Sequence, residues 1–200
     1  MQYHNLKKTI IAGAAIAAVL TLQLVGCRVD PSFDEKVSVT PAAPVKFFVP
    51  EGWPQPVYTF QGNSLTQDGF ELGRRLFYDT KLSRDNTVSC GSCHQQFAAF
   101  SMLDHPQSHG IDGKFGTRNA PSLFNIAWFP AYFWDGNEPM LNNFPIHPIN
   151  NPVEMDESVS NIVTKLNSDG DYKKLFKNAF GDEAIGRTGY SRRWHSSRLQ

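Results

Sequence analysis

The residues with the clearest chemistry form the run Cys90-Gly91-Ser92-Cys93-His94. Two thiols at this spacing reach the two vinyl groups of one haem, and the adjacent imidazole then binds the iron. The chain has 3 cysteines and none after Cys93, so a zinc site lacks the second ligand pair that it normally needs. A thioredoxin-like redox pair would need a preceding strand, which the sequence does not indicate. The motif therefore predicts one covalent haem c, with Cys90 and Cys93 as attachment points and His94 on the iron.

The apolar pattern around this motif indicates helices. Leucines recur at intervals of seven and four over residues 65–76, and Ser89 is a suitable N-cap for a short helix that carries the haem motif. Two further apolar stripes at helical spacing lie over 159–166 and 172–180. No segment between residues 60 and 180 shows the sustained alternation of apolar and polar residues that is typical of strands. We therefore expect a mostly α fold, a cytochrome c-like haem domain of short helices and long loops, over residues 61–183.

The N-terminal residues 1–27 have the pattern of a secretory signal peptide. A positively charged start precedes an apolar run over 9–24, and Leu24-Val25-Gly26-Cys27 resembles the lipobox of bacterial lipoproteins. We expect cleavage before Cys27, a lipid on its thiol, and a periplasmic protein held at the outer membrane, since Arg28 rather than Asp follows. An ordinary signal peptide and a retained membrane anchor are the alternatives, although the apolar run is short for a spanning helix.

Residues 28–60 follow the lipobox and are rich in proline. Prolines disfavour regular pairing and favour extended backbone, so we expect a semi-rigid tether between membrane and domain. Several aromatic residues lie within 47–60, which leaves open a segment wrapped on the domain surface.

The charge balance argues against nucleic acid as a partner. The sequence contains 19 Lys and Arg against 19 Asp and Glu, which gives a formal net charge of 0 at pH 7. Phosphate backbones are bound by a surplus of basic residues, and this chain has none to offer.

Further blocks of sequence lie around the haem motif in a fixed order. They are Leu72-Gly73-Arg74-Arg75-Leu76-Phe77-Tyr78-Asp79, Leu82-Ser83, Gly116-Thr117-Arg118-Asn119-Ala120-Pro121-Ser122-Leu123, Phe133-Trp134-Asp135-Gly136 and Asn151-Pro152-Val153-Glu154-Met155. Their order and spacing resemble the first haem domain of bacterial di-haem cytochrome c peroxidases and of the related MauG group. The resemblance extends from about residue 65 to 182.

The resemblance implies roles for three residues. His94 would be the proximal ligand of the peroxide-reacting haem, and Glu154 would be the distal carboxylate. A carboxylate whose pKa is raised by desolvation can take a proton from one peroxide oxygen and give it to the other. Trp134 matches an aromatic residue that relays electrons between two haems. Without the resemblance, Glu154 would be interpreted as a surface acid before a helix near Asp156, and Trp134 as a core residue.

The remaining site residues stay open at this point. His109 lies where some of these peroxidases place a removable sixth ligand, and His105 and Met102 are alternatives. Asn119 matches a residue near a calcium site between the two domains, so calcium is implied as a second cofactor. The family commonly has Gln at the position of Phe144, so a polar partner for peroxide is missing here.

The C-terminal residues also depart from the family. Its members continue into a second domain with its own haem motif, whereas residues 184–200 contain several arginines and no cysteine. We expect either a solvated basic tail or a truncated or frame-shifted copy. Three functions follow as hypotheses. One is reduction of hydrogen peroxide with electrons from a small cytochrome or cupredoxin, the second is a single-haem electron carrier, and the third is a non-functional fragment.

Overall fold

A computed structural model describes residues 44–181 and Ile185. These belong to the larger of two compact units, which spans 39–200. The predicted signal peptide with Cys27, the first part of the tether and the basic tail over 184–200 lie outside the described residues, apart from Ile185.

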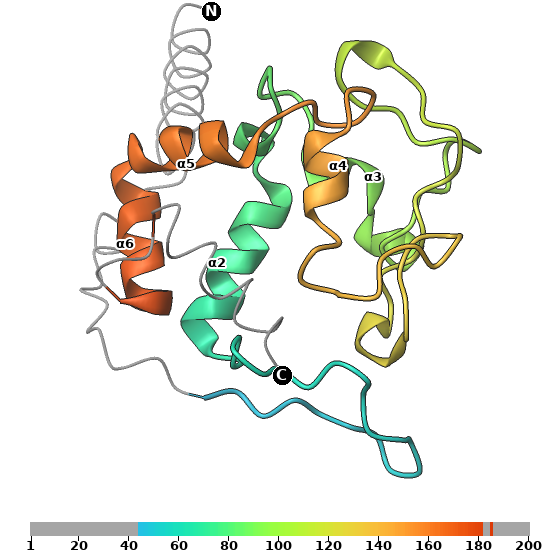
Figure 1. Ribbon diagram of the computed structural model, residues 1–200, viewed down its shortest axis with the longest axis vertical. Coiled ribbons are helices and arrows are strands. Elements are labelled where there is room, and N and C mark those ends of the chain that lie inside the picture. Colours follow the sequence, from blue (N-terminus) through green and yellow to red (C-terminus); the bar gives the residue numbers. More distant parts are fainter. Residues whose placement is uncertain (1–43, 182–184, 186–200) are drawn as a thin grey trace, which may run out of the picture. The chain divides into compact units, whose positions relative to one another are not determined.

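The described part of the chain is helical, as predicted (Figure 1). Its α-helices are α2 (Gln67–Tyr78), α3 (Cys90–Cys93), α4 (Ile146–Asn150), α5 (Val159–Asn167) and α6 (Gly170–Phe180). Short 3-10 turns are η1 (Thr80–Leu82), η2 (Gln96–Ala98), η3 (Ile111–Gly113) and η4 (Ile126–Trp128). Within these residues β-pairing is limited to isolated bridges, and no helix is long and apolar enough to cross a membrane.

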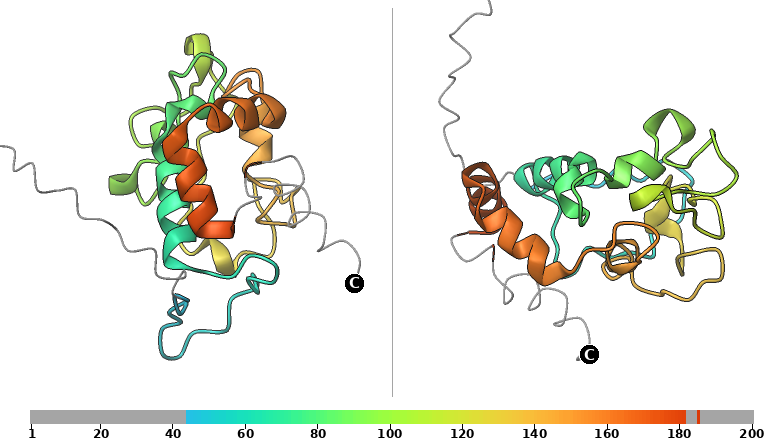
Figure 2. Two further views of the ribbon diagram at one scale, coloured as in Figure 1. Left: turned by 90° about the vertical axis from the view of Figure 1, so that its left-hand side faces the viewer. Right: turned by 90° about the horizontal axis from the view of Figure 1, so that it is seen from above.

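The core lies where α2, α5 and α6 meet. Helix α2 runs beside α6, as both Figure 1 and Figure 2 show. Each of these helices begins at a polar N-cap, as the side chain of Thr66, Ser158 or Asp169 accepts a hydrogen bond from a backbone N–H of the first turn. The buried side chains of the core come from these helices and from the segments beside them: Leu72, Leu82, Ile149, Met155, Ile162, Leu166 and Tyr172.

Residues 44–60 pack against the haem domain through aromatic side chains. The indole N–H of Trp128 donates to the Pro54 carbonyl at 2.8 Å, and the Tyr58 hydroxyl donates to Asn142 Oδ1 at 2.7 Å. The Phe47 and Trp128 rings lie 5.4 Å apart between centroids. These contacts favour the alternative of a segment that lies on the domain surface, with the Phe47, Tyr58 and Phe60 rings half-buried.

Tyr172 offers a test of how α6 is held on α2. Its side chain is fully buried, and its hydroxyl donates to Asp79 Oδ2 at 2.6 Å. We expect Tyr172→Phe to lower the free energy of unfolding of the haem-loaded chain by about 1 kcal/mol, because the carboxylate loses a buried donor. Denaturant unfolding would measure this. Tyr78→Phe is the control, since that ring is 49 % exposed, and an equal loss in both variants would contradict the prediction.

Candidate haem site

The haem motif forms the single helical turn α3. Ser89 is its N-cap, as predicted, and Ser92 Oγ accepts a hydrogen bond from the Ser89 N–H at 3.1 Å. The turn closes where the His94 N–H donates to the Cys90 carbonyl at 2.9 Å. The tight turn fixes both thiols and the imidazole on one short piece of backbone.

Both thiols of the motif are free to bond with a haem. Neither Cys90 nor Cys93 forms a disulfide. Burial raises the pKa of each thiol to about 11, and the nearby Glu154 carboxylate adds to the effect at Cys93. The two sulfurs are therefore protonated thiols at neutral pH in the haem-free chain.

His94 is arranged as a neutral ligand. Burial lowers its pKa, while the carbonyls of Phe100 and Pro121 oppose the shift. Its Nδ1 lies 2.8 Å from the Phe100 carbonyl oxygen. A proton on Nδ1 that is donated to this carbonyl leaves the Nε2 lone pair available, which is the tautomer that iron binds.

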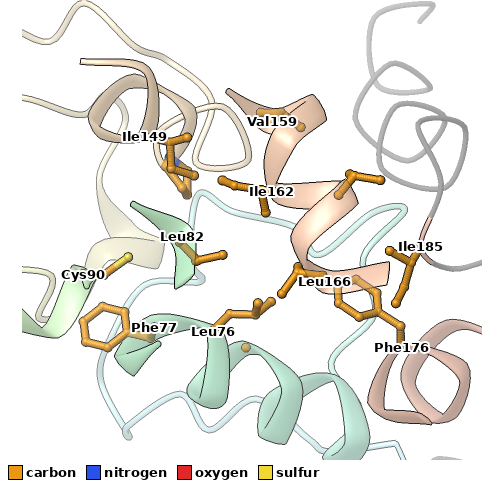
Figure 3. Close-up of a pocket in the computed structure, with 13 residues that line it drawn as sticks. Leu76, Phe77, Leu82, Cys90, Ile149, Val159, Ile162, Leu166, Phe176 and Ile185 are labelled. Carbon is orange, nitrogen blue, oxygen red and sulfur yellow. The ribbon is translucent and has the colours of Figure 1, made fainter. Parts of the chain in front are cut away.

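An apolar cavity of about 300 Å³ begins at the Cys90 sulfur (Figure 3). Apart from that thiol, its wall is formed by apolar side chains and Gly73 from α2, η1, α4, α5, α6 and the segments beside them: Leu76, Phe77, Leu82, Pro145, Ile149, Val159, Ile162, Val163, Leu166, Phe176 and Ile185. Neither His94 nor Glu154 contributes to this wall. A free thiol at the edge of an apolar space, next to a neutral buried imidazole, fits a covalently attached haem.

Glu154 lies close to the haem motif, as its charge acts on Cys93. Burial raises the pKa of its carboxyl, and the Asn151 side-chain amide, which donates to Oε1 at 2.8 Å, opposes the shift. Helix α5 begins only at Val159, with Ser158 as its N-cap. Glu154 is therefore not the acid of a helix N-terminus, which was the alternative interpretation, and its desolvation is typical of a proton-transfer group.

The candidates for the sixth ligand lie on one loop. The rings of His105 and His109 are 5.0 Å apart between centroids, and the Met102 side chain is buried. The His109 carbonyl lies 3.6 Å from Cys93 Sγ. The structure brings this loop to the haem motif, and which of the three side chains binds the iron stays a prediction.

Asn119 and Trp134 are joined to each other. Asn119 Nδ2 donates to the carbonyls of Met102 and His105 at 3.1 and 2.9 Å, while its Oδ1 is buried and lacks a partner. The Trp134 indole N–H donates to the Asn119 carbonyl at 2.8 Å, and the side chain is 63 % exposed. Trp134 is therefore not a core residue, which was the alternative interpretation.

The unpartnered Asn119 oxygen fits one position in a calcium site. Calcium takes six to eight oxygen ligands, and the described residues hold no group of three or more His, Cys, Asp or Glu side chains that could bind a metal ion. Calcium at Asn119 therefore stays a prediction.

Sequence reasoning did not identify three residues that hold the site. The Phe100 carbonyl fixes His94, Asn151 holds Glu154, and Gly110 packs against the Glu154 backbone. Only Asn151 could have been found from the sequence, because it stands three residues before Glu154 in one of the blocks that resemble the family. The other two contacts are made by backbone atoms, and neither a phenylalanine nor a single glycine in a loop reveals its backbone partner.

The fold and the motif together define a c-type haem domain. The chain matches the sequence model of the di-haem cytochrome c peroxidases over residues 67–193 and belongs to this family. It is 34% identical over 175 residues to the methylamine utilization protein MauG of Methylorubrum extorquens. This match covers 87% of this chain and 47% of the relative. It is also 34% identical over 127 residues to the cytochrome c551 peroxidase of Pseudomonas aeruginosa, covering 64% and 36%.

A solved structure has the same fold. A MauG-like protein associated with microbial copper homeostasis superposes with a TM-score of 0.62 at 28% identity, and the match covers 78% of this chain and 51% of that one. The chain thus spans about half the length, or less, of these relatives. Membership of the family also implies haem c as a cofactor.

The raised pKa of Glu154 predicts a pH-dependent cost to stability. An acid whose pKa is higher in the folded than in the unfolded protein lowers the free energy of unfolding as the pH rises. The loss begins at the ordinary pKa of about 4.3 and is complete above the raised pKa. Below this window both states are protonated and the cost disappears. We therefore expect Glu154→Gln, which keeps an oxygen for Asn151, to unfold at a higher temperature than the wild type at pH 7 but not at pH 3.5.

Thermal unfolding of the haem-loaded chain across this pH range measures the difference. Glu71→Gln removes one charge on α2 together with its ion pair to Arg74, so this control should not unfold at a higher temperature than the wild type. A Glu154→Gln variant that is no more stable than the wild type at pH 7 would contradict the prediction.

Proposed function

We propose that this domain reduces hydrogen peroxide to water at a single haem c held by Cys90, Cys93 and His94. Glu154 is its proton-transfer residue. The observation that carries this proposal is the half-buried Glu154 carboxyl, whose pKa is raised and whose backbone segment lies beside the haem motif. Membership of the di-haem cytochrome c peroxidase family supports it.

The haem, when bound, supplies the iron that holds the peroxide and exchanges electrons with it. Ionised Glu154 would accept the proton from one peroxide oxygen and donate it to the other, so that this second oxygen could leave as water. Two electrons and two protons in all convert one peroxide into two waters. A carboxyl with a raised pKa both accepts and donates a proton near neutral pH, and the Asn151 amide keeps one of its oxygens in place.

Electrons come from a small cytochrome or cupredoxin in this proposal. Trp134 supports an entry point, because an exposed indole that is fixed by a hydrogen bond to Asn119 can meet another redox centre and keep its orientation. Calcium bound at the unpartnered Asn119 oxygen would stiffen this contact.

Rapid mixing of the haem-loaded chain with hydrogen peroxide tests the function. We expect Glu154→Gln to slow the reaction by roughly 10²–10⁴-fold, the usual contribution of a general acid–base group. The change in the haem absorption spectrum measures the rate, and Glu71→Gln should react as the wild type does. A six-coordinate, low-spin wild type that does not react with peroxide after reduction would contradict the proposal and favour a single-haem electron carrier.

We also propose that the chain is a lipoprotein on the periplasmic side of the outer membrane. The lipobox-like Leu24-Val25-Gly26-Cys27 run supports this proposal. We expect Cys27→Ser to prevent incorporation of labelled fatty acid during expression in a Gram-negative host and to release the protein from the membrane fraction. A variant that keeps the label would show that another residue carries the lipid.

A further inference from the structure

Gly110 approaches the backbone of Glu154 more closely than any side chain would allow. A Cβ built at Gly110 would lie 2.2 Å from the Glu154 carbonyl oxygen, 2.4 Å from its Cα and 2.5 Å from the Val153 carbonyl oxygen. The Gly110 φ of −112° is open to any residue, so lack of space alone requires glycine here. These neighbours are backbone atoms, which cannot turn aside as a flexible side chain would.

Hydrogen bonds and ion pairs hold the two segments in this contact. The Ile111 N–H donates to the Glu154 carbonyl at 2.9 Å. The Arg84 guanidinium pairs with Asp112 at 2.8 Å and with Asp156 at 3.1 Å, which joins the glycine's turn to the residues after Glu154. The two segments are therefore joined at three points: the Ile111 hydrogen bond and the two Arg84 ion pairs.

The same turn also contacts the haem motif. The carbonyl of His109, the residue before Gly110, lies 3.6 Å from Cys93 Sγ. Residues 109–111 thus lie between the sulfur that attaches the haem and the backbone of the carboxyl that serves it. The thickness of this backbone layer sets how far the Glu154 backbone lies from Cys93.

We propose that Gly110 is a positioning residue that sets the distance between the Glu154 carboxyl and the haem. The proposal rests on the proposed function, in which Glu154 transfers the proton. A methyl group at position 110 would push the backbone of residues 153–154 away from the haem motif and carry the carboxyl with it. Since a misplacement of about 1 Å can cost on the order of 10²-fold in rate, a single methyl is enough to reveal this role.

Haem-loaded wild type, Gly110→Ala, Glu154→Gln and the double variant form the test. Two rates are measured over a range of pH, that of cyanide binding to the ferric haem and that of the reaction with peroxide. Cyanide binding needs no electron donor, and the distal carboxylate takes the proton of HCN as the anion goes to the iron. We expect Gly110→Ala to slow both by roughly 10²-fold but to have no further effect on the Glu154→Gln background, because coupled residues are not additive.

Gly170→Ala is the matched control, since a Cβ there meets nothing within 4 Å, and it should leave both rates unchanged. Full rates in Gly110→Ala, or losses that multiply in the double variant, would overturn the positioning role while leaving the function of Glu154 intact. A Glu154→Gln variant with wild-type rates would instead overturn the proposed function, and the role of Gly110 with it.

A second variant keeps the proposal testable if Gly110→Ala does not take up haem. Arg84→Gln removes the two exposed ion pairs that join the segments and leaves the buried contact itself unchanged. We expect a smaller loss of both rates, again absent on the Glu154→Gln background. Unchanged rates in Arg84→Gln, with Gly110→Ala unable to bind haem, would overturn the proposal.

Discussion

The site depends on the removal of water from four titratable side chains in a small volume. Desolvation disfavours the charged form of any group, so the same cause keeps the Cys90 and Cys93 thiols protonated, His94 neutral and the Glu154 carboxyl closer to neutrality than a surface acid. Each of these states suits its role: a thiol for attachment, a free imidazole lone pair for iron, and a carboxyl that can exchange a proton. Desolvation thus acts in the same sense on all four groups, although only Cys90 lines the apolar cavity.

Irregular backbone, rather than helices, maintains this environment. Phe100 has φ of 57°, a left-handed conformation that costs a non-glycine residue about 1–3 kcal/mol, and its carbonyl is the one that holds His94. Side chains of the following loops fix its backbone in turn, since Ser101 donates to the Ala120 carbonyl and Ser122 to that of Ala99. Long loops are usually mobile, whereas this one is tied down at the places where it touches the site.

The regular part of this arrangement could be predicted from the sequence, and the irregular part could not. The stripes over 159–166 and 172–180 predicted α5 and α6, because the spacing of apolar residues records which face of a helix is buried. The N-cap at Ser89 was predictable from residue type. Nothing periodic marks Gly110, whose contact is made by backbone atoms. Residues 44–60 lie between these cases, since their aromatic residues left a segment wrapped on the domain surface open, but composition alone could not decide between it and a tether.

Phe144 stands at a position where the family commonly has a polar side chain. The resemblance to the family suggested a missing polar group there, and the structure buries this ring against Tyr132 and Phe133, at centroid distances of 5.6 and 4.6 Å. An aromatic ring in such a cluster serves packing and offers no proton. In the proposed function, proton transfer among the blocks that resemble the family therefore depends on Glu154 and on Asn151, which orients its carboxyl. A carboxyl that works without a second polar partner depends all the more on the backbone that sets its position.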